Sequence, residues 1–345
     1  MTNEEDKREN RKERKFAKKQ DRSKFKKSVL KKHEAKRTEE RDERVMNKKL
    51  FRGRVTTIFS NYLSVYSSGK VFTCTLRGVL KKEYMHTKNV VIVGDRVLFE
   101  KSSSTEGAIC KIEERTTLLA RVDKRTAGKQ LIAANIDQIF ITTSVKEPAF
   151  DIPYIDKAVI AALKGNMKPI IVINKIDLPL SPLVEEFIKA YKKMKFPLLM
   201  TSTKTGEGIE ELKKKMKNKA SVFAGLSGVG KSSLINALLH LDLPTGEISQ
   251  KGQRGRHTTT TSSLIKLESG GFCIDTPGIQ DFGIGELTKE ELDWFFSDIA
   301  QIGAGCKFFN CSHSHEPGCV VKEACEKGKL SKLRLTSYVS LLKEI

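Results

Sequence analysis

The residues from Gly225 to Ser232 read G-x4-G-K-S, a spacing typical of loops that bind the phosphates of a nucleoside triphosphate. Glycines allow successive backbone N–H groups to face one anion, and a helix that starts there adds the positive end of its dipole. Lys231 can reach the β- and γ-phosphates, and the Ser232 hydroxyl can bind Mg²⁺. An apolar run at 220–224 and a helical pattern at 233–239 supply the flanks that this loop requires.

A second motif, Asn174-Lys175-Ile176-Asp177, follows a strand-like apolar run at 169–173 and indicates which base is bound. The Asp177 carboxylate can accept two hydrogen bonds from guanine, from N1–H and the 2-amino group, and adenine has neither donor. Lys175 can lie along the base, and Asn174 can bond its edge and brace the loop. Ser202, in a T-S-x-x-x-G loop after the next predicted strand, could with its neighbours offer N–H groups to guanine O6. The motif therefore favours GTP over ATP.

The segment after the phosphate loop has the composition of a GTPase switch. It contains His257 followed by consecutive threonines, and we expect Thr259, or else Thr258, to complete Mg²⁺ coordination. A strand-like run at 271–274 then leads into D-x-x-G, where Asp275 can bind Mg²⁺ through water and Gly278 N–H can sense the γ-phosphate. The predicted nucleotide-binding set is Asn174, Lys175, Asp177, Ser202, Gly225, Leu226, Ser227, Gly228, Val229, Gly230, Lys231, Ser232, Ser233, Asp275 and Gly278.

Ile279 occupies the position after D-x-x-G where many GTPases place a glutamine that orients water. Its side chain can neither donate nor accept a hydrogen bond, so intrinsic hydrolysis should be slow. Within this chain, His257 is the candidate for positioning the attacking water. A contact of His257 to phosphate or RNA without a catalytic role is an equally weighted alternative. The predicted catalytic set is His257, Lys231 and Thr259.

Three cysteines and two histidines lie within 14 residues near the end of the chain. Cys306, Cys311, His313 and Cys319 form a closed Cys3His set, which suits tetrahedral Zn²⁺. We expect one structural zinc ion per chain, and no zinc ligand from Cys325 or His315. The zinc would fix a loop among small helices predicted at 286–299 and 329–344.

The elements that must position these residues alternate between strand and helix patterns. Predicted strands at 136–143, 169–173, 197–200 and 220–224 alternate with predicted helices at 154–164, 181–195 and 209–217, which indicates a parallel sheet. The base-reading motifs precede the phosphate loop, whereas common GTPases have them last. Loops at the carboxyl ends of parallel strands meet at one edge, so moving the termini leaves the site intact. The order predicts a circularly permuted GTPase.

The chain before this region divides into two parts. Residues 1–48 are mostly charged and predict a disordered basic arm, which either folds on RNA or acts as a solubilising tail. Short β-rich runs at 51–59, 62–66, 71–76, 90–99 and 108–113 predict a small barrel of the OB or SH3-like type. We interpret 117–133 as a basic connector. The predicted domains are the arm 1–48, an OB-fold-like barrel at 49–118, a P-loop GTPase at 119–287 and a helical zinc-binding domain at 288–345.

The net charge of +21 favours a polyanionic partner, and a nucleic acid over a membrane. No apolar run approaches the length of about 18 residues that a transmembrane helix needs. The first residues are charged, so no secretory signal is expected. These features predict a cytoplasmic protein, and we expect a monomer.

The combination of barrel, N-K-x-D, G-L-S-G-V-G-K-S, G-R-H-T-T-T, D-T-P-G-I and C-x4-C-x-H-x5-C resembles the family of ribosome small-subunit-dependent GTPases A (RsgA, also called YjeQ or YloQ) over about residues 50–345. The resemblance implies slow GTP hydrolysis, stimulated by the small (30S) ribosomal subunit, and a role in the late maturation of that subunit and its 16S rRNA. Two alternatives stay open: an RNA-binding scaffold that uses GTP as a conformational clamp, and a stand-alone regulatory GTPase.

Overall fold

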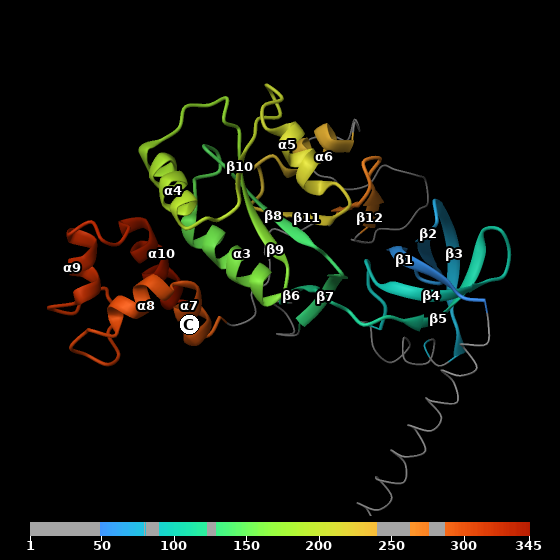
Figure 1. The fold of residues 1–345 in the computed structure, drawn as a ribbon, viewed down its shortest axis with the longest axis horizontal. Helices are drawn as coiled ribbons and strands as arrows, with labels where there is room; N and C mark the ends of the chain where they lie inside the picture. Colours follow the sequence, from blue (N-terminus) through green and yellow to red (C-terminus); the bar gives the residue numbers. More distant parts are fainter. Residues whose placement is uncertain (1–48, 79, 81–89, 123–128, 240–262, 276–286) are drawn as a thin grey trace, which may run out of the picture.

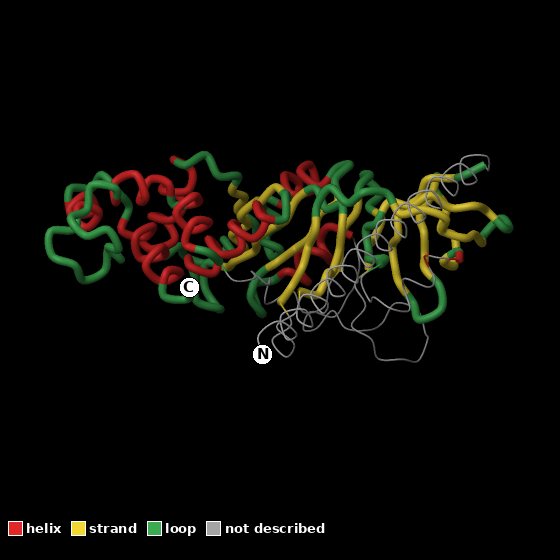
Figure 2. The backbone as a smooth tube through the Cα atoms, turned by 90° about the horizontal axis from the view of Figure 1, so that it is seen from below, coloured by secondary structure: helices red, strands yellow, loops and turns green. Residues whose placement is uncertain are grey.

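The computed structural model describes residues 49–78, 80, 90–122, 129–239, 263–275 and 287–345. They form three parts in a row, with a small barrel at one end, an α/β sheet in the middle and a helical part at the other end (Figure 1 and Figure 2). The predicted arm 1–48 and the switch residues His257, Thr258, Thr259, Gly278 and Ile279 lie outside the described residues. In the described part of the chain, no helix combines the length and apolar character needed to span a membrane.

The first part is a closed barrel of five strands with the order β1-β2-β3-β5-β4, which is OB-like. Every second residue of β2 points into the barrel, where Val65 packs with Val55, Phe72, Phe99 and Ile109. The strands are β1 (Phe51–Ile58), β2 (Leu63–Ser67), β3 (Lys70–Leu76), β4 (Arg96–Lys101) and β5 (Glu106–Ile112). The structure confirms the predicted barrel and distinguishes it from the SH3-like alternative.

The strand predicted at 90–99 is wrong in its first half, because β4 begins only at Arg96. The buried carboxylate of Asp95 accepts a hydrogen bond from the backbone N–H of Ile92 at 2.8 Å, which closes a turn before the strand. The guanidinium of Arg115 binds the same carboxylate at 2.7 and 2.9 Å. The apolar residues before Asp95 are therefore buried in a turn that an ion pair holds, and periodicity alone does not distinguish this from a strand.

The interpretation of 117–133 as a plain connector is also wrong. Its described residues contribute to an antiparallel two-stranded sheet of β6 (Leu118–Val122) and β7 (Lys129–Ala134). Asn135 follows this sheet with a left-handed φ of 56°. Its side chain donates to Gly94 O at 3.1 Å and accepts from the backbone N–H of Thr116 at 3.0 Å. The connection between barrel and sheet is thus a hydrogen-bonded unit.

The central sheet has the order β10-β9-β8-β11-β13-β12, with β12 antiparallel and all other pairs parallel. Its strands are β8 (Gln138–Ser144), β9 (Lys168–Asn174), β10 (Leu198–Met200), β11 (Ala220–Ala224), β12 (Ser263–Lys266) and β13 (Phe272–Asp275). The predicted parallel sheet is confirmed. Because the five parallel strands end on the same edge, the loops that follow them are brought together.

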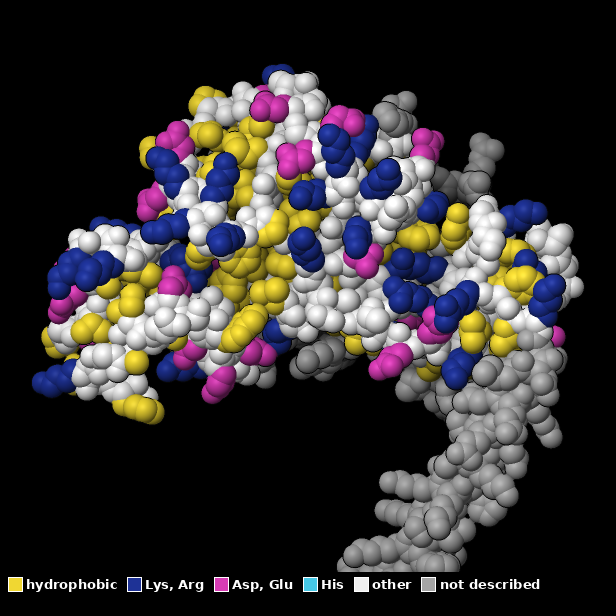
Figure 3. Space-filling view, in the orientation of Figure 1, with side chains coloured by type: hydrophobic (Ala, Val, Ile, Leu, Met, Phe, Trp, Pro, Cys, Tyr) yellow, Lys and Arg dark blue, Asp and Glu magenta, His cyan; other side chains and the backbone are white. Residues whose placement is uncertain are grey.

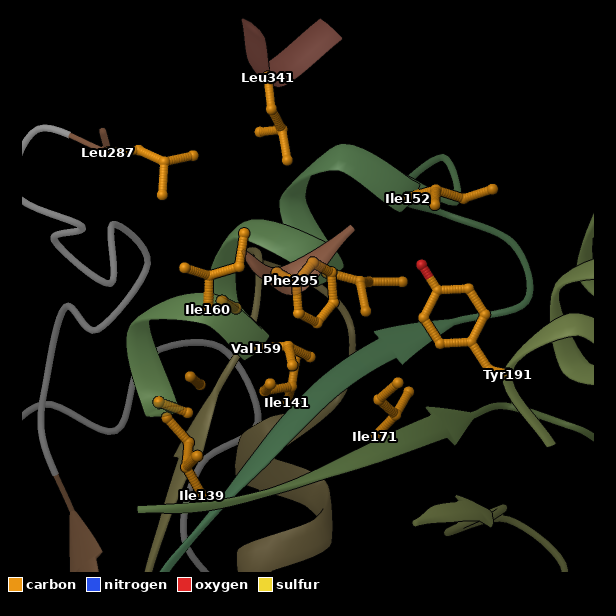
Figure 4. Packing of buried hydrophobic residues seen from close by; sticks show 14 of the residues in the cluster. Ile139, Ile141, Ile152, Val159, Ile160, Ile171, Tyr191, Leu287, Phe295 and Leu341 are labelled. Carbon is orange, nitrogen blue, oxygen red and sulfur yellow. The ribbon is translucent and has the colours of Figure 1, made fainter. Parts of the chain in front are cut away.

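Helices cover both faces of this sheet. Ile139 and Ile141 of β8 pack toward Val159 and Ile160 of α3 on one face, as Figure 4 shows, whereas Phe140 packs on the other face. The first face carries α3 (Ile152–Lys164) and α4 (Pro182–Lys193), and the second carries α5 (Ile209–Met216) and α6 (Lys231–Leu239). The result is a three-layer α/β/α arrangement, buried on both sides as the apolar strands require.

The helical part extends the first of these two cores. Leu292, Phe296 and Leu341 belong to the same buried cluster as the α3 side of the sheet. The helix predicted at 286–299 is divided at Phe296, and a helix after the last predicted metal ligand was not foreseen. The helices are α7 (Lys289–Phe295), α8 (Ser297–Gly303), α9 (Val320–Glu326) and α10 (Lys332–Leu342). These short helices therefore share their core with the sheet domain, and α7 and α10 pack directly on α3.

Arg54 joins the barrel to the strand that carries the predicted residue Asp275. The guanidinium of Arg54 on β1 lies 5.0 Å from the ring centre of Phe272 on β13 and donates to the carbonyl of Asn135. The ring of Tyr66 on β2 meets Phe272 edge-on with centroids 5.7 Å apart. Burial lowers the pKa of Arg54 to about 10, which still leaves it protonated at neutral pH. The barrel is therefore seated on the β12–β13 edge of the sheet.

Candidate nucleotide site and metal centre

The phosphate-loop motif lies between β11 and α6, as its flanking residues predict. Gly230 has a φ of 92°, and a Cβ at this position would lie 2.4 Å from the amide nitrogen of Asn174. Only glycine combines this left-handed backbone with such a close approach. The loop is therefore built to turn tightly against the base-reading motif, and its backbone then enters the first turn of α6.

Lys231 turns back over the loop that precedes it. Its ammonium donates to the carbonyl oxygens of Gly225 at 2.9 Å and Leu226 at 2.8 Å. Desolvation by burial lowers the pKa of Lys231 to about 8. A partly desolvated ammonium beside a helix N-terminus is well prepared to bind an anionic phosphate, because a negative charge offsets the cost of burying the cation. Ser232 and Ser233 follow, half-buried, in the first turn of α6.

Asn174 connects three of the loops at this edge of the sheet. It is buried at the end of β9, and its amide nitrogen donates to the carbonyl of Val229 in the phosphate loop at 2.9 Å. Its amide oxygen accepts from the Thr201 hydroxyl at 3.1 Å. In the structure Asn174 therefore braces the site, which is one of the two roles expected for it.

Lys175 has a left-handed φ of 63°, and its ammonium donates to the carbonyl of Glu147 at 2.6 Å. Glu147 belongs to the segment between β8 and α3, which the sequence did not connect with the site. The neighbouring Pro148 lies 3.7 Å from the position of a Cβ on Gly228 of the phosphate loop. Residues 147–148 thus contact both the base-reading motif and the phosphate loop. No local sequence pattern predicts this contribution to the site.

Asp177 is exposed, and one of its carboxylate oxygens accepts from the buried Ser202 hydroxyl at 2.7 Å. The backbone N–H of Ser202 donates to Glu207 O at 3.0 Å, within its own loop. Ser202 therefore orients the carboxylate, a contact between two loops 25 residues apart. The N–H of Ser202 is thus engaged within its loop, which leaves the expected contact to guanine O6 to the neighbouring N–H groups. The hydroxyl also accepts from the N–H groups of Lys204 and Thr205, each at 3.2 Å.

The parallel sheet brings these residues together in spite of their order in the chain. Asn174 ends β9, Thr201 follows β10, Gly225 follows β11 and Asp275 ends β13. All four strands are parallel, so their carboxyl ends share one edge. The base-reading motifs come before the phosphate loop in sequence, and the structure therefore has the circularly permuted arrangement.

A second site lies in the helical part. The ligand atoms of Cys306, Cys311, His313 and Cys319 all lie within 4.8 Å of one another. The sulfurs of Cys306 and Cys319 are 3.8 Å apart, and His313 Nδ1 lies 3.6 and 3.4 Å from them. His313 adopts a left-handed φ of 57°, which lets its ring face the cysteines within so short a loop. The cluster can hold a metal ion.

These distances fit a tetrahedral ion with thiolate and imidazole ligands. Ligand bonds of about 2.3 Å to sulfur and about 2.0 Å to nitrogen separate two sulfurs by about 3.8 Å, and sulfur from nitrogen by about 3.5 Å. Burial raises the pKa of the Cys311 thiol to about 12 without a cation, so a bound cation would be needed to hold the thiolate. Among the described residues, neither Cys325 nor His315 belongs to the cluster.

Family models match most of the folded chain. The model described as RsgA N-terminal domain matches residues 52–109, which correspond to the barrel. The model described as RsgA GTPase matches residues 112–285, which correspond to the sheet domain with its phosphate loop and base-reading motifs. The two matches together reproduce the division between barrel and sheet domain that the structure shows.

Curated relatives and solved structures agree with these matches. A protein of Chlorobaculum parvum named "Small ribosomal subunit biogenesis GTPase RsgA" is 40% identical over 264 residues, covering 74% of this chain and 85% of the relative. A protein of the same name from Geobacillus sp. strain WCH70 is 38% identical over 297 residues, covering 85% of this chain and 97% of the relative.

Two solved structures extend the comparison to the fold. The crystal structure of YjeQ from Thermotoga maritima has a TM-score of 0.66 at 34% identity, covering 86% of this chain and 98% of that one. The structure of YloQ, described as a circularly permuted GTPase, has a TM-score of 0.63 at 30% identity, covering 86% and 95%. Coverage of this extent includes barrel and GTPase domain together. The chain belongs to the RsgA family of GTPases.

Proposed function

We propose that this protein is a GTP-hydrolysing assembly factor that binds the small ribosomal subunit and its 16S rRNA and assists late maturation of that subunit. The observation that supports the proposal is the hydrogen bond by which Ser202 orients the Asp177 carboxylate, at the same sheet edge as the phosphate loop, an arrangement that favours a guanine nucleotide. Relatives that share this architecture bear the name "Small ribosomal subunit biogenesis GTPase RsgA". We expect slow intrinsic hydrolysis that the subunit stimulates.

In the proposed complex the Asp177 carboxylate binds guanine N1–H and the 2-amino group, and the residues from Gly225 to Ser233 surround the phosphates. The Ser202 N–H is engaged within its loop, so we assign the O6 contact to the N–H of the adjacent residue Thr203. Ser232 and Thr259 would hold Mg²⁺, which supplies positive charge against the phosphates when bound. Asp275 would bind Mg²⁺ through water, the Gly278 N–H would sense the γ-phosphate, and His257 would position the attacking water.

We propose that the metal in the Cys3His cluster is Zn²⁺, one ion per chain with a structural role. Three buried or half-buried thiols and an imidazole form a closed donor set without a position for substrate, which is typical of structural zinc. The proposed domain boundaries are 1–48, 49–118, 119–287 and 288–345. The two-stranded sheet β6–β7 spans the boundary between barrel and GTPase domain.

A positively charged surface supports RNA as the partner. Four exposed lysines lie at the end of α5 and directly after it: Lys214, Lys215, Lys217 and Lys219. In Figure 3, Lys and Arg side chains gather over the middle of the molecule and toward the barrel. Such a surface attracts the phosphate backbone and makes binding sensitive to salt. We infer a cytoplasmic location because the proposed partner is the ribosomal subunit, and we propose a monomer that binds GTP and GDP.

The test is GTP hydrolysis by the purified full-length protein with and without small ribosomal subunits, with large subunits as the control. Stimulation by small subunits alone is the expected result. Tight GTP binding without any stimulation would contradict the proposal and favour an RNA-binding scaffold that uses GTP as a conformational clamp. Stimulation by both subunits alike would indicate a general polyanion effect and would also contradict it.

A further inference from the structure

The loop between the first two metal ligands displays two adjacent phenylalanines to solvent. Phe309 is 99% exposed and Phe308 is 45% exposed. Single exposed apolar side chains are common on protein surfaces, but an adjacent pair in a six-residue loop is a different arrangement. Phe309 has almost no contact with the described residues, so their packing does not explain why an aromatic residue occupies this position.

The loop that carries this pair is fixed at both ends. Cys306 and Cys311 belong to the metal cluster, and the backbone N–H of Cys311 donates to Phe308 O at 3.1 Å. This hydrogen bond closes a turn with Phe309 and Asn310 at its tip. A ring held on a short closed turn loses little conformational entropy when it binds, which favours use as a contact point.

The chemistry around the turn suits a nucleic acid. From Cys306 to His315 the sequence contains Lys307 and no carboxylate. The next residue, Glu316, is directed at the loop backbone, where it accepts from Ser312 N at 2.6 Å and Ser314 N at 3.1 Å. The Lys307 ammonium lies 5.9 Å from the centre of the Phe308 ring. An aromatic tip with one adjacent cation and no exposed acid can approach a base next to a phosphate.

The net charge of the helical part favours a stacking contact to RNA over an electrostatic one. Residues 288–345 contain eight Lys or Arg and eight Asp or Glu, so attraction to phosphates is weak there, although the whole chain carries +21. The arm, barrel and GTPase domain supply the positive charge. A neutral domain gains affinity for RNA by stacking, because base–aromatic stacking needs no net charge.

We propose that Phe309 is a stacking platform for an unpaired base of the small-subunit RNA, with Phe308 as its inner support. This inference rests on the proposed function and adds a contact that is specific for single-stranded RNA. Stacking of one base contributes about 1–3 kcal/mol, which corresponds to about a 5- to 150-fold change in affinity.

The first experiment measures the affinity of zinc-loaded full-length protein for purified small subunits at two salt concentrations. Phe309→Ala should weaken binding at least about fivefold, with the slope against salt unchanged, because no phosphate contact is lost. Phe309→Tyr should restore affinity, and GTP affinity should stay as in the wild type. The control is Ile345→Ala, which removes another half-exposed apolar side chain (52%) of the same domain. Wild-type affinity for Phe309→Ala overturns the proposal.

The second experiment distinguishes a base from an apolar protein pocket. Trp294 is the only tryptophan in the sequence and is 65% exposed, so Trp294→Phe removes the indole fluorescence of the protein. Phe309→Trp in this variant then places the only indole at the tip of the turn. Stacking on a base should quench the indole emission when small subunits are added. Brighter, blue-shifted emission would indicate a ribosomal protein pocket and overturn the assignment. If the wild-type protein does not bind small subunits, the proposed function is contradicted together with this inference. If the wild type binds and the Phe309 variants bind equally well, only the inference about Phe309 is contradicted.

Discussion

The hydroxyl of Ser337 on α10 donates to the carboxylate of Asp156 on α3 at 2.6 Å, and both side chains are fully buried. The Tyr191 hydroxyl on α4 donates to the other oxygen of the same carboxylate. One buried acid therefore links two helices of the GTPase domain to the last helix of the metal-binding part. Desolvation raises the pKa of Asp156 to about 6, and the two hydroxyl donors oppose this shift only in part.

This linkage predicts a dependence of stability on pH. A carboxyl whose folded pKa of about 6 exceeds the unfolded value of 3.8 binds more protons when folded, so stability falls as pH rises between these values and stays low above 6. The cost at neutral pH is about 3 kcal/mol. Asp156→Asn removes this titration.

We therefore expect urea unfolding to show that Asp156→Asn gains stability relative to the wild type between pH 5 and pH 8. Glu211→Gln serves as the control, because this carboxylate is exposed on α5, on the opposite face of the sheet from Asp156. If the difference between wild type and Asp156→Asn is the same at both pH values, the buried carboxylate does not titrate as described.

Lys231→Ala should abolish nucleotide binding and leave RNA binding intact. The ammonium is the only side-chain cation that the described phosphate loop supplies, so we expect a loss of at least about 100-fold in GTP affinity. The fold should tolerate the change, because the buried ammonium is partly desolvated. Titration with a fluorescent GTP analogue measures the loss, and Lys204→Ala, an exposed lysine in the base-reading loop, is the control. Loss of nucleotide-free RNA binding as well would contradict the modular interpretation.

Asp177→Asn should change which base is bound. The amide replaces one acceptor oxygen by a donor, which opposes guanine N1–H and the 2-amino group but matches the C2 carbonyl of xanthine. We expect GTP affinity to fall by about 10²- to 10³-fold and xanthosine triphosphate to bind better than GTP. Competition binding with both nucleotides measures the switch. Ser202→Ala should give a smaller loss for GTP without a change of preference, because Ser202 only orients the carboxylate.

Removal of the metal should loosen the helical part and spare the nucleotide site. The ligands Cys311 and Cys319 lie in the same apolar cluster as the α3 face, so the loop they hold depends on both metal and core. A strong chelator should lower hydrogen-exchange protection in α9 and leave that of β11 unchanged. Zinc analysis should give one ion per chain for the wild type and for Cys325→Ser, and less for Cys311→Ser. An equal loss of zinc in both variants would place Cys325 in the ligand set.

Local chemistry made much of the site predictable. The glycines and Lys231 of the phosphate loop, and the spacing from Cys306 to Cys319, act within 14 residues or fewer, where chain connectivity alone limits the geometry. The apolar strand before Asp177 placed the base-reading motif at the end of a buried strand. The order of these motifs predicted the permuted GTPase, because parallel strands deliver their loops to one edge whatever their order.

Contacts between distant residues were not predictable in the same way. The bond from Lys175 to Glu147, the ion pair of Arg115 with Asp95 and the link from Ser337 to Asp156 join segments whose sequences carry no complementary pattern. The exposure of Phe309 was equally unpredictable, because an aromatic residue in a short loop is buried or exposed according to what packs over it. The sequence alone determined the chemistry of this protein, since each motif holds its reactive groups within a few residues of chain. The tertiary structure decided how those motifs are braced and which aromatic rings reach solvent, because these properties depend on segments that meet only after folding.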